Sequence, residues 1–539
     1  MANLITHARE LLLQEAAAAA AAPRSLWIAI SISVLLLLLL LRMITAGSDA
    51  NGSPAAAPKL LSLIPSPPSR LPVVGHLHLM GDLPYVSMAG LATKHGPDLM
   101  LLRLGAVPTV VVSSPRAAEA VLRTNDHVFA SRPRSMVSDV IMYGATDSCF
   151  APYGEHFRKA RKLVTVHLLN AMKVRSQRPA REEEVRRVLA EVAAAAAAAG
   201  GAAAVDMSEL LHSYVNDLVC RAVSGKFSRE EGRNRLFREL TDINAGLLGG
   251  FNVGDFFPSL GKLELFRKMA SAKAIRVRKR WDQLLDKLID DHAAKMASRE
   301  DGAQEEDKDF IYVLLSLQQE YGLTRDHMKA ILIDMFEAGT DTSYMTLEFA
   351  MAELIRKPQL MKKLQQEVRK NVPEGREMVT EDDLGNMTYL KAVIKETLRL
   401  HPPVPLMIPH FSLDACNIEG YTIPANTRVV VNVWALGRHS GYWENVNEFL
   451  PERFMKGDDA NCVDLKANEF HFLAFGSGRR MCPGVHSASA TIETMLANLM
   501  YRFDWKLPTG MKEEDLDMTE VFGITVSRKE KLLLVPETV

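Results

Sequence analysis

Apolar residues recur three and four positions apart over most of the chain, the spacing that lets a helix bury one face. The clearest examples are residues 206–223 and 358–372, which we expect to be helices. Continuous runs rich in Val and Leu are typical of strands, and they predict a hairpin within 99–114 and further strands at 427–436 and 531–536. The pattern indicates a mostly α protein with small β-sheets (α+β).

Two stretches interrupt this pattern. Residues Ala190–Val205 are mostly alanine, and we interpret this low-complexity run as a surface excursion between helices. Residues 299–309 alternate acidic, basic and small residues and are expected to form a charged loop.

An uncharged apolar run, Leu26–Leu41, lies between Arg24 and Arg42. A helix needs about 20 apolar residues to cross a bilayer, and this run falls at the short end of the usable range. A cleaved signal peptide is the alternative, but its apolar stretch is usually shorter. We therefore expect a membrane anchor, with a small excess of basic residues favouring a cytosolic position for the chain on its C-terminal side.

The chain is expected to divide into four parts. Small residues follow the anchor, and then come Pro65, Pro67, Pro68 and Pro72, which stiffen the chain into an extended form. The expected layout is an N-terminal tail (1–25), a transmembrane anchor (26–43), a linker with a Pro-rich hinge (44–72) and one globular catalytic body (73–539).

Composition excludes several classes of protein. The net charge of the 539 residues is -1, so nothing suggests a nucleic-acid partner. The cysteines are odd in number and far apart, which argues against a disulfide framework and against a zinc site of clustered thiolates. They are Cys149, Cys220, Cys416, Cys462 and Cys482.

The residues around Cys482 form a constellation of their own. Phe475, Gly478, Arg480 and Gly484 complete the pattern F-x-x-G-x-R-x-C-x-G. Glycines let the backbone turn tightly where a Cβ would collide with a flat ligand, and backbone N–H groups can then point at the sulfur. A Gly-rich loop around an ordinary buried cysteine is the alternative, but it does not account for five specified residue types within ten positions.

A second constellation lies on a predicted helix, where residues 338–343 read AGTDTS. Met335, Gly339, Thr342 and Thr346 share one helical face with the first residue of this motif. A packed core helix is the alternative, yet glycine inside a helix costs about 1 kcal/mol relative to alanine. A threonine hydroxyl that bonds back one turn beside a glycine would open a groove in the helix.

Together these motifs resemble those of the cytochrome P-450 family, the haem-thiolate monooxygenases. The resemblance implies the cytochrome P-450 fold and haem b, with Cys482 as the axial ligand of the iron. It implies that Arg480 pairs with a haem propionate and that Phe475, Gly478 and Gly484 shape the haem-binding loop.

The same resemblance implies that Asp341 and Thr342 relay protons to iron-bound dioxygen. The expected reaction inserts one oxygen atom from O₂ into a small apolar substrate, and the other atom leaves as water. Two alternatives are a haem-thiolate isomerase or dehydratase of hydroperoxides and a non-catalytic haem-binding protein. Neither needs the acid–threonine pair, so its presence favours the monooxygenase.

Three residues resemble a structural network of the family. Glu396 and Arg399 lie one helical turn apart in KETLRL, and Arg453 follows in PERF. A lone E-x-x-R could equally be a surface ion pair. By resemblance the three form a buried network that maintains the fold and retains haem rather than taking part in the chemistry.

Two positions depart from the family pattern. Phe157 stands where most relatives have tryptophan, while Arg161 of the same segment remains as an expected propionate partner. His410 stands where many relatives have arginine, and a neutral histidine can hydrogen-bond a propionate without supplying a charge.

Electrons must come from another protein, since no strand is followed by G-x-G-x-x-G and no flavin domain is evident. By resemblance the partner is the membrane-bound NADPH–cytochrome P-450 reductase, and the location is the endoplasmic reticulum membrane. A basic docking face is expected from Arg158, Lys159, Lys162 and Arg479, although each of them could equally be an ordinary solvated charge.

The resemblance extends from the Pro-rich hinge to the C-terminus and is closest to plant microsomal A-type members. The segments 409–412 and 518–536 are similar to the grass indole and indolin-2-one hydroxylases of benzoxazinoid synthesis. Apolar residues of the loop 136–150, of the motif helix and of two later segments are expected to contact a small aromatic substrate. Those named for the pocket are Met335, Ala338, Gly339, Leu406, Ile408 and Phe522.

Overall fold

A computed structural model describes the chain from residue 57 onward, except for four internal segments. The described ranges are 57–198, 203–226, 232–298, 308–455 and 469–539. The predicted anchor at 26–43 lies outside these ranges. Within them, no helix combines the length and the apolar character that a bilayer crossing requires.

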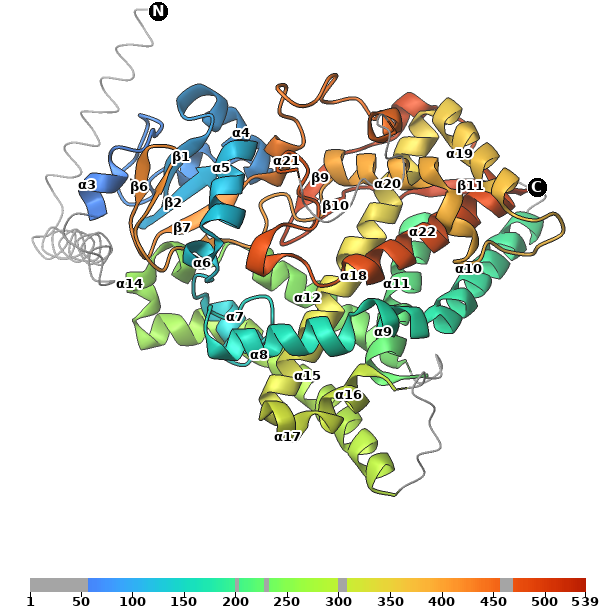
Figure 1. The fold of residues 1–539 in the computed structure, drawn as a ribbon, viewed down its shortest axis with the longest axis horizontal. Coiled ribbons are helices and arrows are strands. Elements are labelled where there is room, and N and C mark those ends of the chain that lie inside the picture. Colours follow the sequence, from blue (N-terminus) through green and yellow to red (C-terminus); the bar gives the residue numbers. More distant parts are fainter. Residues whose placement is uncertain (1–56, 199–202, 227–231, 299–307, 456–468) are drawn as a thin grey trace, which may run out of the picture.

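The strands pair into small sheets, and the largest has the order β1–β2–β7–β4 (Figure 1). In it β1 (Leu99–Leu104) and β2 (Val107–Val112) are antiparallel, whereas β2 pairs in parallel with β7 (Arg428–Val431), which is antiparallel to β4 (His410–Phe411). The other sheets are antiparallel: β3 (Val205–Asp206) with β11 (Leu533–Thr538) and β8 (Phe503–Lys506), β9 (Glu520–Phe522) with β10 (Val526–Arg528), and β5 (Cys416–Ile418) with β6 (Tyr421–Ile423).

Helices make up most of the described chain. The long ones are α10 (Arg178–Ala198), α11 (Met207–Ser224), α12 (Arg233–Gly249), α15 (Glu264–Ala297), α18 (Arg325–Arg356), α19 (Pro358–Asn371), α20 (Thr388–Leu400) and α22 (Val485–Arg502). The shorter ones are α3 (Ala57–Leu61), α4 (Pro84–His95), α5 (Pro115–Glu119), α6 (Asp126–Phe129), α7 (Met136–Ile141), α8 (Glu155–Leu163), α9 (Ala171–Ser176), α13 (Val253–Phe256), α14 (Pro258–Gly261), α16 (Phe310–Ser316), α17 (Gln318–Tyr321) and α21 (Val433–Leu436). Single tight or wide turns are η2 (Leu77–Leu79), η3 (Ala120–Thr124), η4 (Val164–Leu168), η7 (Asp383–Asn386), η8 (Pro451–Phe454), η9 (Gly478–Arg480) and η10 (Glu513–Asp515).

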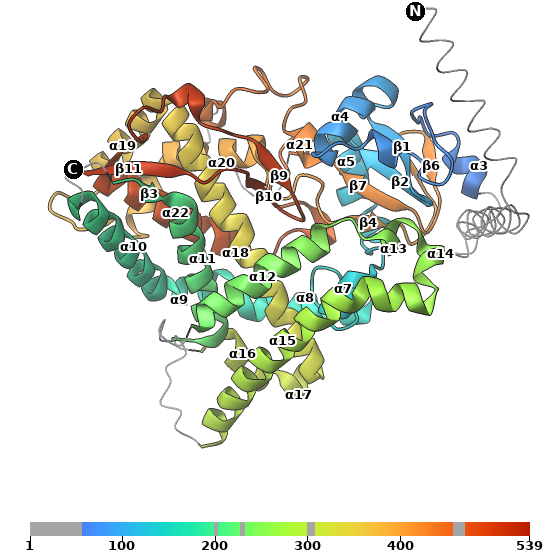
Figure 2. The ribbon, with the colours of Figure 1, turned by 180° about the vertical axis from the view of Figure 1, so that it is seen from behind.

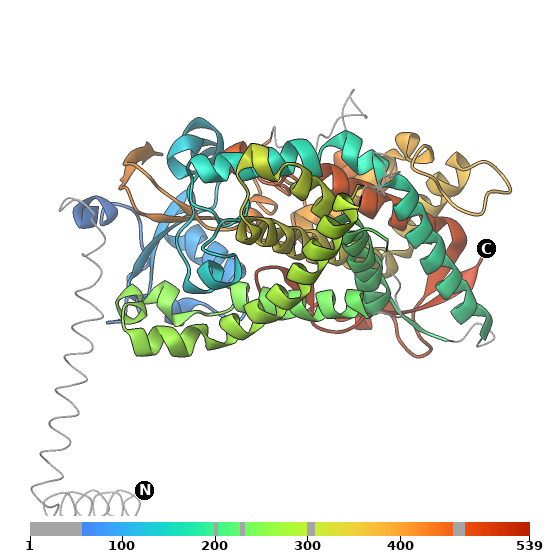
Figure 3. The same cartoon turned by 90° about the horizontal axis from the view of Figure 1, so that it is seen from below.

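The large sheet lies at one end of the molecule, and α10, α19 and α22 lie at the other (Figure 1). Seen from behind, α12 and α15 cross one face (Figure 2). Seen from below, α14 and the start of α15 run along one edge beneath the sheet end (Figure 3). Helix α18 runs through the middle and joins two apolar cores: Leu347 and Ala350 pack with α11 and α22, while Ile331 and Phe336 pack with α12 and α15.

Several predicted elements are confirmed. The hairpin within 99–114 is β1–β2, residues 206–223 form α11, and residues 358–372 contain α19. The side chain of Asp206 accepts a hydrogen bond from Glu209 N (3.0 Å), which satisfies an otherwise unpaired amide at the start of α11. In 427–436 only the first half is a strand, because β7 gives way to α21 after Asn432 caps that helix.

Two interpretations were wrong. The alanine run does not leave the helix at residue 190, because α10 continues to Ala198. Alanine has the highest helix propensity of all residues, so low complexity there extends a helix. The segment 136–150 is not a simple loop, since α7 occupies Met136–Ile141. The predicted charged loop falls largely on 299–307, outside the described residues.

Candidate active site

The loop that precedes α22 bends back on itself around Cys482. Cys482 N donates to Phe475 O (2.8 Å), and Gly484 N donates to Cys482 Sγ (3.3 Å). Gly478 has a φ of 69°, and a Cβ at this position would collide with the Leu122 carbonyl oxygen. The loop therefore needs a glycine at residue 478, and a backbone N–H points at the sulfur as expected for a ligating thiolate.

Cys482 keeps an exposed surface although the protein surrounds it. Burial raises the pKa of its thiol, while the Gly484 N–H and the charge of Arg161 act in the opposite direction. Ala338 is likewise exposed although it lies in the middle of α18, between buried Phe336 and buried Thr340. The cysteine loop and α18 thus each present accessible surface at a residue of the predicted site.

Arg480 is held by backbone oxygens of the segments around it. Its Nε donates to Ala130 O (2.6 Å), and its terminal nitrogens donate to the carbonyl oxygens of Ser148 (3.4 Å), Cys149 (3.3 Å) and Ala151. The guanidinium carbon lies 3.7 Å from the centre of the Phe157 ring. The ring therefore makes a cation–π contact with the loop arginine, a contact that the replacement of tryptophan by phenylalanine preserves.

Two further arginines lie beside Arg480. Arg161 on α8 donates to Met481 O, and buried Arg132 donates to Ile408 O (2.6 Å) and Cys149 O (3.0 Å). Burial lowers the pKa of Arg480 to about 9, and the neighbouring charge of Arg132 adds to that effect. Burial also lowers the pKa of Arg132 to about 10. Sequence reasoning missed Arg132, because an isolated arginine before a proline carries no motif.

Two buried carboxyls face this cationic cluster. Asp147 accepts from Cys149 N (2.6 Å), and Asp334 on α18 accepts from Ser148 N (3.1 Å) and Ser148 Oγ (2.6 Å). Burial raises the pKa of both carboxyls, and Asp147 raises that of Asp334 further. Their ionised forms are less favoured than those of exposed carboxyls, so they are weaker counterions for the three guanidinium groups.

His410 is a neutral member of the cluster. Its Nδ1 is 2.8 Å from Phe129 O, and burial lowers its pKa to about 3. The histidine cannot replace the charge of the arginine found in many relatives.

These residues fit haem. A cysteine sulfur with an N–H directed at it is the ligand type expected for haem iron, and three guanidinium groups with weak counterions suit two propionates. Cys482 would hold the iron, while Arg480, Arg161 and Arg132 lie where they could bind the propionates. At Gly484 an added Cβ would make only an ordinary 3.6 Å contact with the sulfur, so the protein alone does not require glycine there.

The motif helix places its residues on different sides. Thr342 Oγ1 donates to Ala338 O (2.8 Å), and Thr346 Oγ1 donates to Thr342 O (2.8 Å). The side of Gly339 that a side chain would occupy faces Val219 of α11 (3.2 Å), so this glycine permits close helix packing. Asp341 lies close to His212 of α11 and Asp242 of α12, and its Oδ2 accepts from Thr525 Oγ1 (3.4 Å), just before β10.

Glu396, Arg399 and Arg453 come together in a buried ion network. Glu396 Oε1 lies 2.7 Å from Arg399 Nη2 and 3.1 Å from Arg453 Nε, and Glu396 Oε2 accepts from Arg399 Nε (2.7 Å). Leu450 N also donates to Oε1 (2.7 Å). The arginines donate further to carbonyls between residues 437 and 448, so the network ties α20 to the segment before the cysteine loop.

The residues named for the substrate pocket occupy several different environments. Met335 packs in the core with α12 and α15, whereas Leu406 packs against the large sheet. The Phe522 ring lies 5.9 Å from the Tyr85 ring, and Ile408 contributes its carbonyl to Arg132.

The expected docking residues are partly neutralised. Lys159 pairs with Glu155 (2.8 Å) one turn away on α8, and Arg479 pairs with Asp126. Arg158 and Lys162 are exposed on the same helix.

The fold and this site define a haem-thiolate oxygenase. A family model described as "Cytochrome P450" matches residues 65–535, and the chain belongs to this family. It is 77% identical to indole-2-monooxygenase of Zea mays, with 100% of both chains covered. It is 51% identical to 3-hydroxyindolin-2-one monooxygenase of Zea mays, with 92% of each covered. A solved zebrafish cytochrome P450 with abiraterone has the same fold, with a TM-score of 0.68 at 24% identity, covering 85% of this chain and 100% of that one. The protein is a cytochrome P450 monooxygenase that uses haem and O₂.

Proposed function

We propose that this monooxygenase hydroxylates indole or a closely related small indole-like plant metabolite. The observation that carries the proposal is the 77% identity to a protein named indole-2-monooxygenase over its full length. Relatives named for indolin-2-one and its 3-hydroxy derivative are more distant, at 52% and 51% identity. These named substrates share a small bicyclic aromatic body with one ring nitrogen, which suits an apolar pocket with few polar groups.

The chain's own residues would hold the haem in a fixed orientation. Cys482 would supply the thiolate, whose charge the Gly484 N–H would temper, and Arg480, which stacks on Phe157, would bind the propionates together with Arg161. Bound haem supplies the activation of O₂ and the oxidation of the substrate. The protein's contribution is to position the substrate, exclude water and control the protons.

Proton control would fall to Thr342 and Asp341. The Thr342 hydroxyl donates its hydrogen to Ala338 O, which leaves its oxygen lone pairs free to accept from a donor on the exposed side of Ala338. Burial, with a smaller effect from Asp242, raises the pKa of Asp341 to about 7. A carboxyl with this pKa can take up and release a proton near neutral pH, as a relay requires.

Electrons would come from an NADPH-dependent reductase, with Arg158 and Lys162 of α8 as exposed cations of its docking face. The N-terminal segment 26–43 would anchor the protein in the endoplasmic reticulum membrane, ahead of the linker at 44–72 and the catalytic body at 73–539. The apolar composition of Leu26–Leu41 supports this arrangement.

The test is reconstitution of the purified full-length protein with a plant NADPH–cytochrome P450 reductase. Indole should shift the haem from low to high spin and yield a product carrying one oxygen atom from ¹⁸O₂. Indolin-2-one, 3-hydroxyindolin-2-one and naphthalene, a bicycle without nitrogen, serve as comparisons. Turnover of naphthalene equal to that of indole, or no turnover of any of the three heterocycles, would overturn the proposed substrate class.

A further inference from the structure

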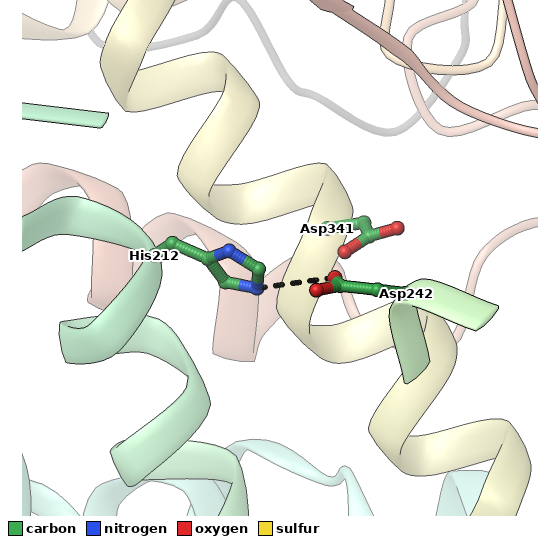
Figure 4. A group of neighbouring side chains, drawn as sticks. All are labelled: His212, Asp242 and Asp341. Atoms are coloured by element: carbon green, nitrogen blue, oxygen red, sulfur yellow. Dashed lines mark ion pairs between the residues drawn. The ribbon is translucent and has the colours of Figure 1, made fainter. Parts of the chain in front are cut away.

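Three potential metal ligands from three separate helices lie close together beside α18. They are His212 of α11, Asp242 of α12 and Asp341 of α18 (Figure 4). One ligand atom from each lies within 4.8 Å of the other two. His212 Nε2 points at Asp242, with 4.0 Å between Nε2 and Oδ1.

Two of these side chains are buried and leave a polar atom without a partner. His212 is 5% exposed and its Nε2 makes no hydrogen bond, while Asp341 is 4% exposed and its Oδ1 makes none. Each buried polar atom left unpaired costs about 1–3 kcal/mol. Both atoms face the same small space, so one ligand could satisfy both of them.

The surroundings are rich in carboxyl groups that burial makes hard to ionise without a cation. Glu337 lies one turn before Asp341, with a buried Oε1 that makes no hydrogen bond, and burial together with Asp341 raises its pKa well above the usual range. Arg238, whose charge acts on His212 and Asp242, forms a bidentate pair with Glu209. A cation that replaces a carboxyl proton would stabilise the ionised form of Asp341, so a cation is the kind of ligand that this space favours.

The histidine is preorganised for coordination. Its ring stacks on the Tyr344 ring, with 4.3 Å between centres and 13° between planes. Burial lowers the pKa of His212 to about 3, so the imidazole is neutral and its nitrogen lone pair is available at any physiological pH. Asp242 is 54% exposed, which gives an ion a route from solvent.

We propose that His212, Asp242 and Asp341 bind one divalent transition-metal cation, for which zinc is the best fit. One imidazole nitrogen and two carboxylate oxygens are common zinc ligands, and water would complete a tetrahedron. With zinc–ligand distances of about 2.0–2.2 Å the ligand atoms stand about 3.4 Å apart, so the side chains would draw in by about 1 Å. In one respect the inference rests on the proposed function: a cation bound to Asp341 would withhold that carboxylate from the proton relay.

The site is tested by equilibrium dialysis of the haem-loaded, full-length protein against zinc chloride, followed by elemental analysis of zinc and iron. The wild type should retain about one exchangeable zinc per iron, and His212→Gln and Asp242→Asn should each weaken binding by at least about tenfold. The control is His471→Gln, which removes a histidine paired with a single carboxylate, Glu469 (2.9 Å). No bound zinc, or equal binding in wild type and His212→Gln, overturns the site.

The link to the relay is tested by turnover. In the wild type, zinc should raise the amount of peroxide released per NADPH consumed. In His212→Gln, zinc should leave this ratio unchanged. An equal effect of zinc on both proteins overturns the link. Dialysis involves no turnover, so a failed relay leaves the binding result intact. Absent zinc binding likewise leaves the proposed role of Asp341 untouched.

Discussion

Replacing Glu396 by glutamine tests the buried ion network most directly. The carboxylate accepts four hydrogen bonds: two from Arg399, one from Arg453 and one from Leu450 N. Glutamine can keep its oxygen at the Oε1 position, but its amide nitrogen cannot accept from Arg399 Nε. Two guanidinium groups, 0% and 11% exposed, then lose the counterion that they share.

The magnitude follows from these contacts. One lost hydrogen bond to a charged group contributes about 1.5–3 kcal/mol, and the remaining bonds weaken when the acceptor is neutral. Together with the unpaired buried charge, the free energy of unfolding should fall by about 3–5 kcal/mol. A whole domain is typically stable by only about 5–15 kcal/mol, so haem-loaded protein should also accumulate poorly.

The assay is urea unfolding of the haem-loaded protein followed by far-ultraviolet circular dichroism. The control is Glu452→Gln, the same substitution in η8 at a carboxylate that is 41% exposed and pairs with Lys363 (2.6 Å). Its effect should stay below about 1 kcal/mol. If Glu396→Gln does not accumulate, Arg453→Lys takes its place in the assay. Lysine retains the positive charge of Arg453 but loses the forked geometry of the guanidinium group. Its loss in free energy of unfolding should lie between those of Glu396→Gln and Glu452→Gln. A Glu396→Gln variant within about 1 kcal/mol of the wild type would refute the reasoning.

Three further outcomes are expected. Thr342→Ala should consume NADPH with peroxide in place of product while Thr342→Ser retains coupling; unchanged coupling in the alanine variant would contradict the relay. Phe157→Leu removes the ring that stacks on Arg480 and so loses a cation–π contact of about 1 kcal/mol. Haem transfer from this variant to apomyoglobin should therefore be several-fold faster than from the wild type. Equal transfer rates would show that the ring does not help to retain haem. Burial lowers the pKa of His401, but hydrogen bonds to Glu353 and Glu520 outweigh it and raise the pKa overall. The stability contributed by His401 should thus be complete below about pH 6.5 and be lost as the pH rises through the raised folded-state pKa. Urea unfolding of the wild type and His401→Gln from about pH 5 to pH 9 checks this, and a stability difference that grows with pH would be evidence against it.

The parts of the molecule that could be predicted are those encoded in short windows. The β1–β2 hairpin follows from two apolar runs and the turn between them, within fourteen consecutive residues, Leu99 to Val112. The Thr342 bond to Ala338 spans one turn of a single helix. The bend at Gly478 also follows from a local rule: glycine readily adopts a positive φ, and Gly478 has one.

The remainder depends on pairings between distant segments. Nothing near Arg132 in the sequence shows that it lies beside Arg480. The two residues come together in the folded chain, where both donate to the carbonyl oxygen of Cys149. The His212, Asp242 and Asp341 group is assembled by three helices, and the periodicity of each helix says nothing of the other two. The motif predicts that Gly339 helps to open a groove in its helix. In the structure this glycine packs against Val219, and that contact depends on how α11 crosses α18.

The anchoring of Arg480 has a consequence for biosynthesis. Its carbonyl partners Ala130 and Ala151 precede it by 350 and 329 residues, and β2 likewise waits for β7 before the central sheet can close. While the ribosome is still translating the middle of the message, the first sheet has an open edge that can pair with other chains. The cofactor can be captured only after almost the entire polypeptide has emerged, so a premature stop codon anywhere before Cys482 should leave no partly active product.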